Sequence, residues 1–215
     1  MRLVHGRVEL GLHELQAGSG PSLLLLHGLW GSSADWGPEV EAWPGAAYAL
    51  DLSGHGSSGR LVGGSYSAEI FAGDADAALA RIGPAVVAGA GLGAYVALLL
   101  AGARPDQVSA ALLLPGVGLE GGGPLPYYLT SGARRASPVH EPPAGSDRFL
   151  AACATDVRPP DYARSFGERA RRLLLAENGS DRPAWWAELR DCATSETAPT
   201  EPAEALALLA ERVLE

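Results

Sequence analysis

The stretch AVVAGAGLGAYVALLLAG, residues 85–102, fits two motifs that lead to different functions. Gly89, Gly91 and Ala94 match the pattern G-x-G-x-x-G/A, in which glycines let the pyrophosphate of a dinucleotide approach a helix N-terminus. The same stretch matches G-x-S-x-G, a sharp strand-to-helix turn that carries a nucleophilic serine, except that Gly91 stands in the place of the serine. The surrounding sequence has to decide between these interpretations.

Short apolar strands alternate with helical segments along the chain. Residues 7–16 alternate in polarity and predict an antiparallel edge strand, whereas the apolar run 21–28 predicts a strand buried on both faces. Further strands are expected within 46–59, 84–91, 108–116 and 171–181, and helices at 32–43, 67–83, 92–103 and 201–215. This order predicts an α/β fold with a mainly parallel sheet that is covered on both sides.

Length and composition indicate one globular domain over residues 1–215. The net charge of −9 argues against a nucleic-acid partner, and no apolar run is long enough for a membrane span. The polar, alternating start MRLVHGRVEL is unlike a signal peptide, so we expect a cytoplasmic protein. Cys153 and Cys192 are interpreted as reduced thiols, although one disulfide stays open. The sequence indicates no metal site and no cofactor.

The pattern loosens after Gly116. Residues 117–147 are rich in Gly, Pro and Ser and contain the aromatic pair Tyr127 and Tyr128. We interpret residues 117–170 as a reduced lid inserted into the domain, because long irregular insertions are often functional.

Two observations weaken the dinucleotide interpretation. A dinucleotide site needs an acidic residue after the next strand to bind the ribose, but here that strand ends at Pro115. In addition, two apolar strands already precede the motif. Upstream, LLLLHGLWGS (23–32) and ALDLSGHGSSG (49–59) each close an apolar strand. Taken in order with VVAGAGLGAYVALLLA, these motifs resemble the α/β-hydrolase superfamily over residues 7–118, and more loosely at the terminal helix.

The resemblance implies an oxyanion hole made of backbone N–H groups from Leu29 or Trp30 and from Leu92. It also implies a nucleophile at Gly91, which has no side chain to attack a substrate. The family's general base is a histidine ahead of the last helix, but the five histidines are His5, His13, His27, His55 and His140. The corresponding stretch CATSETAPTEP (192–202) contains none. Asp181 is the candidate for the acid of the triad. The chain is shorter than is usual for the family, which leaves open whether it contains the late strands of the sheet.

His27, His140 and Asp181 are therefore the candidate catalytic residues. For His27 the simpler interpretation is support of its loop through hydrogen bonds, and for Asp51 and His55 it is formation of a turn. Candidate ligand-binding residues are Leu29, Trp30, Gly91, Leu92, Tyr127 and Tyr128. Trp36 and the pair Trp185–Trp186 fit ordinary packing equally well. Nothing in the sequence pairs Ser57 or Ser58 with a base.

The first functional hypothesis is a degenerate family member that binds a small apolar molecule or a protein partner without covalent hydrolysis. The second is a cyclase, lyase or isomerase that uses the oxyanion hole without a nucleophile. A hydrolase with a relocated nucleophile comes third, and a dinucleotide-binding protein last. The sequence leaves open whether the protein forms a homodimer.

Overall fold

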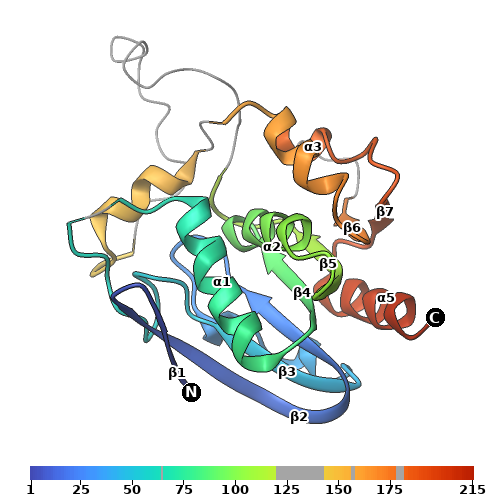
Figure 1. The fold of residues 1–215 in the computed structure, drawn as a ribbon, viewed down its shortest axis with the longest axis horizontal. Helices are drawn as coiled ribbons and strands as arrows, with labels where there is room; N and C mark the ends of the chain where they lie inside the picture. The colour runs from blue at the N-terminus through green and yellow to red at the C-terminus, as the bar shows by residue number, and fades with distance from the viewer. Residues whose placement is uncertain (64, 120–142, 156–157, 178–181) are drawn as a thin grey trace.

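The computed structural model describes residues 1–63, 65–119, 143–155, 158–177 and 182–215. A twisted sheet runs through the centre of the molecule (Figure 1). Its strand order is β1-β2-β4-β5-β6-β7, and β3 also pairs with β2. The strands are β1 (Arg2–His5), β2 (Val8–Leu26), β3 (Gly45–Leu50), β4 (Ala85–Ala90), β5 (Val108–Leu114), β6 (Leu173–Ala176) and β7 (Ser195–Ala198). The pairs from β2–β4 through β6–β7 are all parallel, which confirms the predicted fold class.

The predicted edge strand 7–16 is wrong in position. Strand β1 forms the edge and pairs antiparallel with the start of β2, so residues 8–16 lie inside the sheet. Strand β2 continues through Leu26 and bends, so that its two halves pair with the same strand β3. Leu12 and Leu26 both lie opposite Leu50 of β3. The apolar run 23–26 that follows the bend is fully buried, as the sequence predicted.

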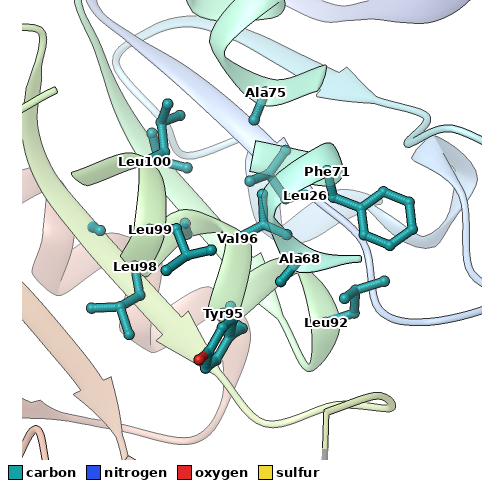
Figure 2. Packing of buried hydrophobic residues seen from close by; sticks show 14 of the residues in the cluster. Leu26, Ala68, Phe71, Ala75, Leu92, Tyr95, Val96, Leu98, Leu99 and Leu100 are labelled. Carbon is teal, nitrogen blue, oxygen red and sulfur yellow. The ribbon is translucent and has the colours of Figure 1, made fainter. Parts of the chain in front are cut away.

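One face of the sheet is covered by helices α1 (Ala68–Ile82) and α2 (Leu92–Ala103) (Figure 1). Helix α1 begins at Ser67, whose side chain accepts a hydrogen bond from the Ile70 amide, and ends at Gly83, as predicted. Helix α2 is buried over almost its whole length, which explains why it is apolar all round. In Figure 2 Val96 of α2 lies beside Leu26 of β2 and faces α1, which contributes Phe71.

The opposite face is covered by the terminal helix α5 (Pro202–Leu214) and by the segment that follows β2. The helix predicted at 32–43 is wrong: this segment forms two 3-10 turns, η1 (Ser33–Asp35) and η2 (Pro38–Val40). Ser32 does cap the first turn, but Trp36 and Gly37 leave the helical region and Pro38 cannot donate the next hydrogen bond.

The second half of the chain adds the 3-10 helix η4 (Arg148–Ala154), helix α3 (Asp161–Gly167) and the short helix α4 (Ala184–Ala187). Strand β7 is present, so a late strand has not been lost. Trp185 and Trp186 of α4 are fully buried against Tyr95 and against each other, which makes them core residues. Within the predicted lid 117–170, the described residues include η4 and α3.

A buried carboxylate of α1 joins the loop after β3 to the hairpin between β1 and β2. The Asp74 carboxylate accepts hydrogen bonds from the Ser53 amide (2.9 Å) and hydroxyl (2.6 Å), and it lies 2.7 Å from Nδ1 of His5. Its side chain is completely buried, and burial raises the pKa of this carboxyl. These contacts satisfy a polar group that would otherwise destabilise the core.

We expect Asp74→Ala to lower the free energy of unfolding by about 3 kcal/mol, because it leaves the buried amide and hydroxyl of Ser53 without an acceptor. The matched control on the same helix is Asp76→Ala, which removes an exposed ion pair with Arg104 and should cost less than about 1 kcal/mol. Urea unfolding of both variants measures the difference. Equal losses would contradict a structural role of Asp74.

Candidate functional site

The turn between β4 and α2 has the backbone geometry of a nucleophile elbow. Gly91 adopts φ 53° and ψ −114° at the helix start, a left-handed conformation that is strained for a residue with a side chain. The strand and helix approach closely, because a Cβ on Gly89 would lie 2.1 Å from the carbonyl oxygen of Gly93. Gly91 therefore sits where the sequence resemblance implied the nucleophile.

The carbonyl oxygen of Val117 lies against the elbow and accepts two backbone hydrogen bonds. One comes from the Leu29 amide (2.8 Å) and the other from the Leu92 amide (2.9 Å). Leu29 and Leu92 are among the residues whose amides the resemblance implied as oxyanion donors. The two donors converge on one oxygen, and that oxygen belongs to the protein's own backbone.

The segment 115–118 also occupies the space in which a nucleophile side chain would lie. A Cβ built on Gly91 would be 2.3 Å from the Val117 oxygen and 2.4 Å from the Gly116 carbonyl carbon. These atoms belong to the backbone, so they cannot move aside by a change of rotamer. The position of this segment thus depends on the absence of a side chain at residue 91.

A cavity of about 310 Å³ opens beside Gly91. It lies between the segment after β5 and the segment around α4, and its described lining residues are Gly91, Leu114, Pro115, Gly116, Gly118, Arg182, Pro183, Ala184, Trp185 and Trp186. Trp30 is not among them. No described lining residue is a histidine or a carboxylate. The sequence did not single out Arg182, although its position directly after the candidate acid was a usable signal.

His27 directly follows β2, is buried, and lines a second cavity of about 180 Å³ together with Thr200. Its Nδ1 donates to the Gly28 carbonyl (2.7 Å), and its Nε2 accepts from the Leu52 amide (3.1 Å). Burial lowers the pKa of this imidazole. Because both ring nitrogens are engaged with backbone, the geometry favours the supporting role over a general base. Thr200 follows β7, where the resemblance implied the missing base.

His55 packs against His27, with ring centroids 4.8 Å apart. Its Nδ1 donates to the Ser53 carbonyl (3.0 Å), and in the described part of the chain its buried Nε2 has no hydrogen-bond partner. Burial, followed by the nearby His27, lowers the pKa of His55 to about 4. Both histidines are therefore neutral parts of the core at neutral pH.

The structure pairs Ser57 with a histidine, which the sequence did not indicate. Nε2 of His13 lies 3.1 Å from the Ser57 hydroxyl and 3.1 Å from the Asp51 carboxylate, to which Ser57 donates at 2.8 Å. Burial pushes the pKa of Asp51 upward, but hydrogen bonds from Ser33 and Ser57 lower it to about 2. Because one ring nitrogen of His13 faces both partners, the imidazole cannot accept the serine proton at one nitrogen while the aspartate holds the other, as a triad requires. The cluster fixes the loop after β3.

Four predicted site residues, Tyr127, Tyr128, His140 and Asp181, lie outside the described residues. Among the residues that are described, no group of three His, Cys, Asp or Glu side chains is placed to hold a metal ion. None of the described helices is both long and apolar enough to span a membrane.

The buried histidines predict a pH dependence of stability. His55 has a folded pKa of about 4 against about 6.5 when unfolded, so the unfolded chain binds the extra proton as the pH falls through 6.5. We expect this residue to lower the free energy of unfolding by about 2 kcal/mol between pH 8 and pH 5. Urea titrations at both pH values should show a smaller loss for His55→Gln. An unchanged loss in this variant would contradict the assignment.

Comparison with known proteins agrees with this geometry. A model of the alpha/beta hydrolase family matches residues 23–213. Lipase LipV of Mycobacterium tuberculosis (strain ATCC 25618 / H37Rv) is 36% identical over 175 residues, which cover 79% of this chain and 65% of the lipase. The match thus spans less than two thirds of the lipase's length.

Solved structures share the fold along the whole chain. The hypothetical protein PA1622 from Pseudomonas aeruginosa PAO1 has a TM-score of 0.72 at 19% identity, with 100% of this chain and 99% of that chain covered. The bottromycin epimerase BotH, solved in complex with bottromycin A2, has a TM-score of 0.62 at 22% identity, with 99% and 97% covered. The sheet, the elbow and the match over residues 23–213 lead to one conclusion: the chain belongs to the alpha/beta hydrolase family.

Proposed function

We propose that this protein binds a small, largely apolar organic molecule in the cavity beside Gly91 and does not hydrolyse it through a covalent serine intermediate. The observation that carries this proposal is the position of the Val117 carbonyl, which accepts from both Leu29 and Leu92. In an acyl-transfer enzyme, such donors stabilise the oxyanion of the transition state. Here the protein fills their hydrogen-bonding capacity itself.

The chemistry of the elbow supports the same proposal. Gly91 offers no atom that could form an acyl intermediate, and the stretch after β7 supplies Thr200 in place of a histidine. The similarity to a lipase favours hydrolysis in the wider family. Residue 91, however, is where the covalent step of such an enzyme would occur, and this chain departs from the pattern there.

The cavity supports a binding role. Its volume of about 310 Å³ lies at the lower end of the range for small-molecule sites, and apart from Arg182 its described walls are glycine, proline, leucine, alanine and tryptophan. The apolar side chains favour an apolar ligand body through burial of its surface, and polar groups make up much of the remaining lining.

A second candidate is a non-covalent enzyme such as an isomerase, and the fold shared with an epimerase favours it. The two amides already converge on a single oxygen, as stabilisation of an enolate would require. This function requires the Val117 carbonyl to leave the amides when substrate binds. Substrate-dependent exchange of a substrate α-proton with solvent deuterium, followed by NMR, would favour this candidate over simple binding.

The proposal predicts that the wild-type protein keeps its intact mass after incubation with a fluorophosphonate probe, because the elbow contains no activated serine. Intact-mass spectrometry measures this directly, with an active serine hydrolase as the positive control. A stoichiometric adduct would overturn the proposal, and digestion would then identify a relocated nucleophile.

Introduction of the missing hydroxyl should not create an esterase. We expect Gly91→Ser to show no turnover of p-nitrophenyl butyrate above the wild type, and to lower the free energy of unfolding by about 3 kcal/mol through its contact with the Val117 and Gly116 backbone. The matched control is Gly6→Ser, which has a similar φ of 61° but open space around its Cβ.

A larger loss for Gly91→Ser than for Gly6→Ser isolates the steric contribution from the cost of a positive φ. Equal losses would show that segment 115–118 gives way easily, and robust turnover would show that a general base lies within reach of residue 91.

A further inference from the structure

Arg182 sets the charge of the described wall of the cavity beside Gly91. Among the described lining residues it is the only ionisable side chain. A ligand that enters this cavity therefore meets a guanidinium, which favours an anionic group.

The N–H groups of the two indoles in the cavity wall already donate hydrogen bonds within the protein. Nε1 of Trp185 donates to the Leu119 carbonyl (2.9 Å), and Nε1 of Trp186 donates to the Glu177 carboxylate (3.1 Å). Glu177 is also neutralised by Arg190, at 2.8 Å. Both tryptophan N–H groups are therefore engaged, and neither indole offers a free polar group to a ligand.

The guanidinium of Arg182 is held in place but only partly satisfied. Its carbon lies 5.7 Å from the centroid of the Trp186 ring, and one terminal nitrogen donates to the Ala176 carbonyl (3.3 Å). Within the described residues its buried Nε has no hydrogen-bond partner. A guanidinium with free donors matches the two oxygens of a carboxylate. A buried donor without an acceptor lowers the stability of the folded protein, and a ligand carboxylate would remove this cost.

We propose that the ligand of this cavity is an organic monocarboxylate with an apolar body, whose carboxylate pairs with Arg182 while its body fills the space between Leu114 and Pro183. The inference rests on the proposed function, because it names the ligand class of the same cavity. It is a statement about recognition alone and requires no chemical step.

The test compares octanoate with methyl octanoate, which keeps the apolar body and loses the charge. Isothermal titration calorimetry on the wild-type protein should give at least about tenfold tighter binding of octanoate. Arg182→Met should remove this preference and leave weak binding of both compounds, and Arg182→Lys should keep part of it. Arg171→Met removes an exposed arginine that pairs with Asp106 away from this cavity, so it should bind octanoate like the wild type.

Equal affinity of the wild type for the two compounds, no binding of either, or an unchanged preference in Arg182→Met would each overturn the inference. The wild-type comparison stands even if the variant fails to fold. Conversion of methyl octanoate to octanoate, followed by NMR in the same samples, tests the proposed function separately. Ester cleavage would refute that function, whereas the carboxylate preference would still decide the role of Arg182.

Discussion

The Val117 carbonyl oxygen accepts hydrogen bonds from two backbone amides. These two bonds link three loops of the molecule. Leu29 follows β2, Leu92 opens α2 after β4, and Val117 follows β5. These strands are neighbours in a parallel sheet, so their carboxyl ends meet at one edge. The amides must find an acceptor once water is excluded, and in this protein a backbone carbonyl is that acceptor.

This arrangement determines the shape of the adjoining cavity. Because segment 115–118 turns inward over Gly91, the space of the reacting group is occupied, and the remaining cavity extends toward Arg182 and the two tryptophans. The Leu29 and Leu92 amides, which bind the Val117 carbonyl, are not among the described lining residues of this cavity. Its one ionisable described side chain is Arg182.

The sheet, the elbow and the caps at Ser67 and Gly83 could be predicted from the sequence, because apolar runs, glycines and capping residues act locally. The continuous bend of β2 could not, since it depends on pairing both halves with β3. The cluster of His13, Asp51 and Ser57 and the burial of Asp74 arise from contacts between distant segments. The position of the Val117 oxygen left no signature beyond the flanking Gly116 and Gly118, because every residue carries a carbonyl.

Gly91 and segment 115–118 depend on each other energetically. A side chain at residue 91 meets the backbone of the segment, and a segment that moves away leaves the Leu29 and Leu92 amides without their acceptor. Each change alone therefore costs stability. The two costs overlap, because a displaced segment also makes room for the side chain, so the free energies of the two changes do not add.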